Sequence, residues 1–305
     1  MFRLVQRRRY YFIFSGIIIG IALVSMIISM IRTGYPFQVG VDFQSGTRFE
    51  VQFTESVNED EIRAVFNDFD VANPSITSLQ GEELQNAWQV RSEALNPDEI
   101  DVILAALAER VAPLNEDAVR VESVSASVAQ EVTRAAVLAI VVAAVLILLY
   151  IMFAFRQVPN PFQYGASAVI AMLHDLTVIF GFISVAGLFF GWEVDALFLT
   201  AALTVAGFSL QDTIVVFDRV RENVRKSPLE DFETLVNRSV LETIHRSLAT
   251  QLNAMFVLVA IMLFGGASIR HFIAVLFIGL LSGTYSSIFN AVPVLVAWQM
   301  RAEAA

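Results

Sequence analysis

The stretch AGFSLQDTIVVFDRVREN, residues 206–223, is apolar up to Phe217, as is typical of a helix that crosses a membrane. Asp212 nevertheless lies inside the apolar part, and a cluster of charges begins at Asp218. A carboxylate in a membrane helix costs about 2.5–3.5 kcal/mol on insertion scales, so it normally faces a bundle interior or a wet cavity. Asp212 precedes Phe217 by five residues, which places it roughly 7 Å inside the end of its helix. The stretch therefore predicts a bundle of membrane helices with an acid between them.

The composition of the whole chain agrees with an integral membrane protein. Of its 305 residues, 56% are hydrophobic and 16% are charged, and the mean hydropathy is +0.63. Soluble domains average about 45–50% apolar and about 25% charged residues. The chain has no cysteine, which excludes disulfides and thiolate metal sites. It also lacks the G-x-x-x-x-G-K-[ST] loop that cradles phosphates, and we expect no cofactor.

Six apolar segments are long enough to cross a membrane, because about 20 apolar residues in a helix span the ~30 Å hydrocarbon core. These segments are 11–31, 135–155, 164–190, 194–217, 248–267 and 271–298. The first follows four arginines and therefore resembles a signal peptide. It is longer than the roughly 7–15 apolar residues of a signal, and no A-x-A cleavage site follows it. We interpret it as a membrane anchor.

The distribution of Lys and Arg predicts the orientation of the chain, because cytoplasmic loops carry an excess of these residues. The bases on one side of the predicted bundle lie in these positions: 1–10, Arg156, 218–247 and 299–305. The opposite short turns contain only Arg270. Both terminal segments and the loop 218–247 are therefore predicted to be cytoplasmic, and the segment 32–134 extracytoplasmic.

The acidic residues are concentrated in the predicted extracytoplasmic segment. Residues 33–133 hold nineteen Asp or Glu against five Arg, whereas the rest of the chain holds eleven acids and fifteen Lys or Arg. Outside the short flanking loops, no basic stretch is suited to nucleic acid. We therefore expect no nucleic-acid partner.

The first half of this segment predicts a strand and a helix. Residues 47–53 alternate, which places Phe49, Val51 and Phe53 on one face of a strand. Asn58 and Glu61 then form a predicted capping box at the start of a helix. The inward residues expected on this helix are Ile62, Val65, Phe66 and Phe69.

The second half completes a small α+β domain. Strands are predicted at 74–79 and 86–91, and a helix begins with Asn96 as its N-cap and Pro97 at its first position. The inward residues of this helix are Ile100, Ile103, Leu104, Leu107 and Val111. Residues 118–124 form the last strand. The order β-α-β-β-α-β is that of a ferredoxin-like module.

The predicted cytoplasmic loop 218–247 has an amphipathic helical pattern. Its apolar positions are Phe232, Leu235, Val236, Val240 and Ile244. Such a face could lie on the membrane or against a partner. We favour a third arrangement, in which the helix folds back on its own bundle.

Asp212 has two interpretations. Ser209, Gln211 and Thr213 lie close to it, and Ser209 and Thr213 are placed to hydrogen-bond the carboxylate or hold water. A carboxyl between burial and a nearby cation can take up and release a proton, so Asp212 is a candidate protonation site. The alternative is that it only anchors the end of its helix.

The fifth segment begins HRSLATQLNAMF, which places a polar stripe at helical spacing. The stripe comprises Arg246, Thr250, Gln251 and Asn253. Arg246 is a candidate partner of Asp212, and it is equally well explained as an anchor on the cytoplasmic side.

His174 and Asp175 lie about halfway along the third segment. Because adjacent residues on a helix diverge by about 100°, we expect the two side chains to point in different directions. The chain has only three histidines and no H-E-x-x-H motif, which argues against a metal site. A proton relay and a structural tie between helices both remain open.

Two further patterns concern packing and a turn. Small residues that allow close helix packing occur at Gly165, Ala166, Gly181, Gly187, Ala201, Ala202, Gly207, Gly279 and Gly283. Just after the first segment, VGVDFQSGT predicts a turn at Gly40 and Gly46, with Asp42 bonding its own backbone.

Several motifs together resemble the SecF family, the six-helix subunits of the bacterial SecDF complex. GVDFQSGT, with Gly40, Asp42, Phe43 and Gly46, is similar to the family's G-[IV]-D-F-x-G-G-T, except that Ser45 replaces one glycine. AMLHD in the third segment is similar to A-L-x-H-D, and GFSLQDTIVVFDRVRE to G-Y-S-x-N-D-T-V-V-V-x-D-R-I-R-E. The fifth segment keeps His245, Arg246 and Thr250 of the family pattern but lacks its later Ser and Thr residues.

This resemblance covers nearly the whole chain and implies a function. It implies half of an RND-like bundle in the bacterial cytoplasmic membrane, which forms a heterodimer with SecD to complete twelve helices. Such a complex would assist the SecYEG translocon and use the proton-motive force to pull or release unfolded preproteins on the outer side. By position, Asp212 resembles the family's essential membrane aspartate and Arg246 the arginine near it. No enzyme activity is implied, and the relay or supporting residues would then be His174, Asp175, Ser209, Gln211, Thr213 and Thr250.

Two other functions fit the sequence less well. An RND-like transporter half for a small solute would require an outer domain with a substrate pocket. Residues 32–134 are too few to form such a domain. A membrane hydrolase using His174 and Asp175 would require a nucleophile and an oxyanion arrangement, and neither accompanies them in the sequence. The sequence thus predicts a six-helix membrane all-α protein with a small α+β outer domain.

Overall fold

A computed structural model describes residues 3–71, 74–79, 85–227 and 229–303. The predicted end segments 1–10 and 299–305 include residues 1–2 and 304–305, which lie outside this part. The chain divides into two compact units, Met1–Gln38 with Leu138–Ala305, and Val39–Val137. One boundary follows Gln38, and the other follows Val137, within the helix Ala126–Ala154.

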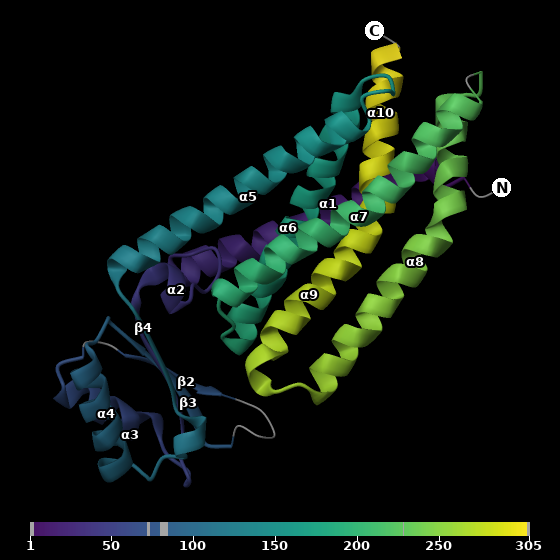
Figure 1. The fold of residues 1–305 in the computed structure, drawn as a ribbon. Coiled ribbons are helices and arrows are strands. Elements are labelled where there is room, and N and C mark those ends of the chain that lie inside the picture. Colours follow the sequence, from purple (N-terminus) through teal and green to yellow (C-terminus); the bar gives the residue numbers. More distant parts are fainter. Residues whose placement is uncertain (1–2, 72–73, 80–84, 228, 304–305) are drawn as a thin grey trace. The chain divides into compact units, whose positions relative to one another are not determined.

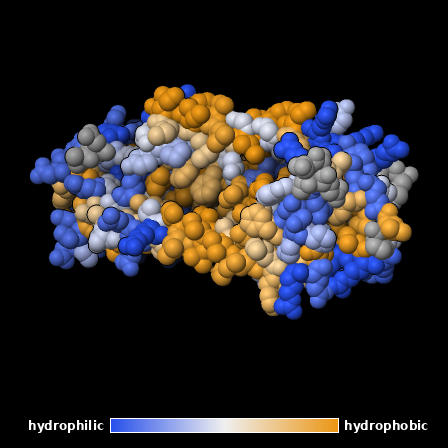
Figure 2. Space-filling model, turned by 90° about the horizontal axis from the view of Figure 1, so that it is seen from above, coloured by the Kyte–Doolittle hydropathy of each residue, from blue (hydrophilic) through white to orange (hydrophobic). Residues whose placement is uncertain are grey.

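The first unit is built from helices (Figure 1). A short 3-10 turn, Val5–Arg7, leads into α1, Arg8–Thr33. The long helices that follow are α5 (Ala126–Ala154), α6 (Pro161–Phe190), α7 (Ala196–Lys226) and α8 (Phe232–Phe264). The last helix is interrupted by a π-helical turn: α9 (Ala267–Ser286), the turn Ser287–Ala291, and α10 (Val292–Glu303). In the described part of the chain, six helical spans are long and apolar enough to cross a membrane. Figure 2 shows hydrophobic side chains grouped in a broad band of the visible surface, bordered by hydrophilic ones.

Glycines allow two pairs of these helices to approach closely. A Cβ at Gly181 of α6 would lie 2.2 Å from Ala22 Cβ of α1, and one at Gly279 of α9 would lie 2.1 Å from Val205 Cγ2 of α7. Both glycines therefore have the packing role predicted from the sequence. Gly207 does not, because a Cβ there would meet nothing within 4 Å.

The amphipathic pattern of residues 218–247 packs on the bundle, as we favoured. This segment consists of helix ends, because α7 continues to Lys226 and α8 begins at Phe232. Leu235, Val236 and Val240 are buried in one apolar cluster with residues of the other helices, including Phe217. Asp231 caps α8, since its carboxylate accepts a hydrogen bond from Thr234 N at 3.0 Å.

The second unit is a four-stranded antiparallel sheet with two helices. Its elements are α2 (Val41–Gln44), β1 (Gly46–Gln52), α3 (Glu59–Asp68), β2 (Ser75–Leu79), β3 (Ala87–Ser92), α4 (Pro97–Arg110), a 3-10 turn (Glu116–Ala118) and β4 (Arg120–Val124). The strand order β2-β3-β1-β4 places β1 and β3 at the centre, with Phe49 opposite Val90 on one side and Val121 on the other. This is the predicted ferredoxin-like arrangement.

One apolar cluster holds the second unit together. Phe49, Val51 and Phe53 of the predicted inward face are all buried, and Phe66 packs edge-on against Phe49 at 5.3 Å between ring centroids. The capping boxes at Asn58 and Asn96 are both present, as predicted. Phe69 was predicted wrongly to face the core: α3 ends at Asp68, and Phe69 is 37% exposed.

The glycine-containing turn lies at the start of the second unit and leads into β1. Gly46 has φ of +130°, and a Cβ there would lie 2.5 Å from the carbonyl oxygen of Ser92, so only glycine fits. Ser45, which replaces the family's glycine, also has a left-handed φ of 64°. Gly40 has φ of −70° and precedes α2 as its N-cap. The turn therefore depends on Gly46 more than on Gly40.

Candidate functional site

Asp212 is buried between two helices of the first unit. It lies on α7 with 3% of its surface exposed, and its Oδ2 accepts a hydrogen bond from Gln251 Nε2 of α8 at 2.7 Å. Ser247, also buried, lies one turn before Gln251 on α8. The Gln251 amide is neutral, so it solvates the carboxyl without supplying an opposite charge.

Arg246 does not contact Asp212. The positions of Arg246 and Gln251 on α8 differ by five residues, which at about 100° per residue turns their side chains roughly 140° apart. Gln251 faces α7, and Arg246 is exposed on the other side of α8. In the described part of the chain, no ion pair joins Arg246 to Asp212. Gln211 and Thr250 are exposed as well, and the Thr250 hydroxyl donates to the carbonyl of Arg246 at 3.0 Å.

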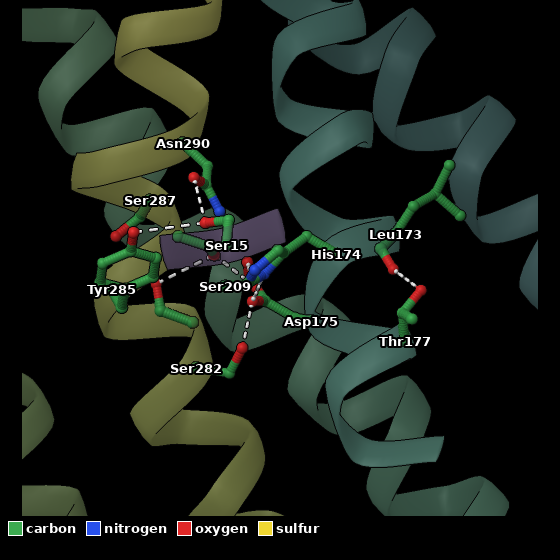
Figure 3. A network of polar contacts seen from close by, with 12 residues as sticks. Ser15, Leu173, His174, Asp175, Thr177, Ser209, Ser282, Tyr285, Ser287 and Asn290 are labelled. Atoms are coloured by element: carbon green, nitrogen blue, oxygen red, sulfur yellow. Dashed lines mark hydrogen bonds and ion pairs between the residues drawn. The ribbon is translucent and has the colours of Figure 1, made fainter. Parts of the chain in front are cut away.

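A second buried carboxylate, Asp175 of α6, forms the centre of a polar network (Figure 3). Asp175 has none of its surface exposed. Its Oδ2 accepts hydrogen bonds from Ser209 of α7 and Ser286 of α9, each at 2.6 Å. Its Oδ1 accepts one from Ser282 of α9 at 2.6 Å and lies 3.1 Å from His174 Nδ1. The carboxylate thus joins three helices that contact one another.

Two sequence expectations about these residues were wrong. His174 and Asp175 do not point apart, because the imidazole and the carboxylate both bend from their helix into the same buried site, as Figure 3 shows. Ser209 does not bond Asp212, because its hydroxyl is turned toward Asp175. Thr213 also bonds elsewhere: its hydroxyl donates to the carbonyl of Ser209 at 3.1 Å.

The network extends toward α1 and the π-helical turn. Tyr285 lies beside the ring of His174, 6.2 Å between centroids, and its hydroxyl donates to the carbonyl of Tyr11 at 3.0 Å. Ser15 of α1 donates to Asn290 Oδ1 at 2.8 Å, and Asn290 lies within the π-helical turn. Such turns are frequent at functional sites.

Sequence reasoning missed the serines that bind Asp175. Ser282 and Ser286 occur four residues apart in the apolar segment 271–298, so they share one face of their helix. That spacing was a usable signal, because polar side chains on one face of a membrane helix normally face the bundle interior. It did not say which residue they would bind.

The arrangement holds two buried carboxyl groups by hydrogen bonds from neighbouring helices. Both carboxyls are bound by neutral donors, and His174 is the one basic side chain whose contact with either is described. Among the described residues, no group of three or more His, Cys, Asp or Glu gathers as a metal site would require. No Ser or Thr at these two sites stands beside a base in a nucleophile arrangement.

Comparison with known protein families and relatives identifies the chain. Residues 103–301 match the model described as "Protein export membrane protein SecD/SecF, C-terminal" and residues 33–57 match the "SecD/SecF GG Motif". The chain belongs to the SecD/SecF family. The SecF protein translocase subunit of Anaerolinea thermophila is 39% identical over 305 residues, covering 98% of this chain and 94% of that protein. The subunit from Thermobaculum terrenum is 40% identical over 271 residues, covering 87% of this chain and 86% of that protein.

Within the SecD/SecF family, the chain is a SecF subunit of the Sec protein-export machinery. It is a multi-pass membrane transport protein and not an enzyme. Solved SecDF from Thermus thermophilus, described as a translocon-associated membrane protein, superposes with a TM-score of 0.82 at 27% identity. The chain covers 39% of that solved chain's length, and 38% of the Bacillus subtilis SecDF, to which it is 32% identical. In those relatives, the SecF-like part is fused to a further part in one polypeptide, which implies partnership with SecD.

Proposed function

We propose that this SecF subunit works with SecD to couple the proton-motive force to preprotein translocation on the outer side of the membrane. Asp212 is the proposed protonation site. The observation that carries this proposal is its burial in the bundle with an amide donor, Gln251, and without a cation among its described contacts. A carboxyl so placed changes its interactions with α8 whenever it gains or loses a proton.

The membrane potential is large enough to use such a site. Moving one charge through the field is worth about 2.3 kcal/mol per 100 mV, which shifts a conformational equilibrium roughly fiftyfold. The unit Val39–Val137, proposed to be extracytoplasmic, would be the part that acts on unfolded preproteins delivered by SecYEG. Both termini would then be cytoplasmic, in agreement with the distribution of basic residues.

A polar stripe on α7 supports pairing with SecD within the membrane. The stripe consists of residues that share one face and are exposed or half-exposed in the single chain: Thr200, Thr204, Gly207 and Gln211. On α8, Arg246, Thr250 and Asn253 form a similar exposed face. Small and polar residues on membrane helices normally face other helices rather than lipid. Arg246 would contact SecD from this surface rather than Asp212 within its own chain.

The test is preprotein export in cells that carry Asp212→Asn, which keeps the size of the side chain and removes its titration. Asp218→Asn is the matched control, because Asp218 lies on the same helix with 57% of its side chain exposed. Membrane assembly and SecD binding are measured in parallel. We expect export to fall in Asp212→Asn alone while assembly holds. Normal export in that variant would show that Asp212 only anchors the end of its helix, and the proposed protonation role would be wrong.

A further inference from the structure

Asp175 lies at the centre of a polar network in the bundle, and the proposed proton site at Asp212 does not require it. Its carboxylate has four polar contacts, two on each oxygen, and they come from α6, α7 and α9. A buried carboxylate loses much of its favourable hydration, so the loss of any one of these hydrogen bonds would cost free energy. A single side chain therefore bonds residues of all three helices.

The close crossing of α7 and α9 brings Ser209 and Ser282 to the same carboxylate. Gly279 and Gly283 are four residues apart on α9, and a Cβ at Gly283 would lie 3.3 Å from Ser209 Cα and 3.7 Å from Asp175 Oδ2. A larger side chain at either glycine would separate the helices. The close crossing is thus a condition for Ser209 and Ser282 to reach the same carboxylate.

Ser209 connects this network to the Asp212 site. It lies one turn before Asp212 on α7, and the Thr213 hydroxyl bonds its carbonyl across the intervening turn. An α-helix is rigid over one turn, so a contact that fixes the rotation of α7 at Ser209 also fixes the direction of Asp212. Asp212 uses that direction to meet Gln251 of α8 at 2.7 Å.

We propose that Asp175 is a positioning residue, which acts through the Ser209 hydroxyl to hold α7 at the rotation that presents Asp212 to Gln251. This inference rests on the proposed function only for its consequence in export. The rotation itself is a property of the fold. Ser282 binds the same carboxylate at the same distance but belongs to α9, so it does not set the rotation of α7 directly.

The experiment compares Ser209→Ala with Ser282→Ala in the full chain bound to SecD. Each substitution removes one hydroxyl that donates to Asp175 at 2.6 Å. The chain has no cysteine, so Asp212→Cys introduces a unique thiol at a position that is 3% exposed in the native chain. The rate at which a membrane-permeant maleimide labels this thiol reports the rotation of α7 at position 212.

We expect Ser209→Ala to speed labelling about tenfold, the factor produced by losing one hydrogen bond to a charged group, and Ser282→Ala to change it far less. Equal acceleration in both variants would show that Asp175 merely tightens the whole bundle, and would overturn the proposal. No change in Ser209→Ala would overturn it too. Asp175→Asn is expected to behave like Ser209→Ala, but the serine pair decides the question if that variant fails to assemble.

This test is independent of the test of the proposed function. Labelling measures the direction of position 212 whether or not a proton is carried there. Normal export in Asp212→Asn would remove the coupling role and leave the positioning role standing. Conversely, equal labelling in the two serine variants would remove the positioning role and leave the proton site untouched.

Discussion

Asp212 and Gln251 meet across the contact of α7 and α8, where the Gln251 amide donates to the Asp212 carboxylate at 2.7 Å. Gln251 is 3% exposed, as is Asp212, so neither group has ready access to bulk water in the single chain. The pair replaces the ion pair with Arg246 that the sequence had suggested. A change in the protonation of Asp212 would therefore alter a hydrogen bond to a neutral amide of α8.

Gln251→Leu is expected to lower export about tenfold or more. The substitution removes the donor to Asp212, and hydrogen bonds to charged groups contribute about 1.5–3 kcal/mol. The ionised carboxylate should therefore be harder to form in the bundle. Leu252→Ala is the control, because Leu252 is the adjacent residue on α8, is 50% exposed and lies outside the face formed by Arg246, Thr250 and Asn253. Export that falls equally in both variants would assign the effect to α8 as a whole.

Arg246→Ala is expected to weaken binding to SecD and to leave the stability of the single chain unchanged. Its guanidinium has no described partner in this chain and lies on the face of α8 turned away from Asp212. Leaving a partner group unpaired in an interface costs on the order of tenfold or more in affinity. Co-purification with SecD measures this, with Arg225→Ala as control, since Arg225 is also exposed near the end of α7. Similar loss in both would make Arg246 a general anchor.

Gly279→Ala should destabilise the helical unit by about 1–3 kcal/mol, the usual cost of overpacking. The added Cβ would lie 2.1 Å from Val205 Cγ2. Thermal unfolding of the purified chain measures the loss, and Gly207→Ala is the control because that position faces open space. A second substitution, Val205→Ala, should restore much of the stability. Failure of this rescue would contradict the contact.

Asn96→Ala should loosen the first turn of α4 by about 1 kcal/mol, because it removes an N-cap. Asn96 and Glu99 form a reciprocal capping box, in which Asn96 N donates to Glu99 Oε2 at 2.8 Å. Hydrogen exchange of the first amides of α4 in the full chain is the measurement. Asn96→Ser retains a capping oxygen and should exchange at close to the native rate. The idea is wrong if the alanine and serine variants exchange alike.

Much of the second unit, Val39–Val137, could be predicted because its signals are local. The alternation of Phe49, Val51 and Phe53 requires only the two-residue period of a strand. The caps at Asn58 and Asn96 require only residues within three positions. Phe69 was misplaced for a matching reason: the helical period extended to it, but the helix ended one residue earlier.

Six membrane helices, a small α+β unit and an acid at position 212 that faces the bundle interior all follow from the order of residues along the chain. The partner of that acid, Gln251, and the three serines around Asp175 become known only from the folded structure; these serines are Ser209, Ser282 and Ser286. The physical reason is that helical periodicity fixes which residues share a face of one helix, whereas the neighbour of that face depends on how helices cross. Here the crossing of α7 and α9 is set by the close approach at Gly279 and Gly283.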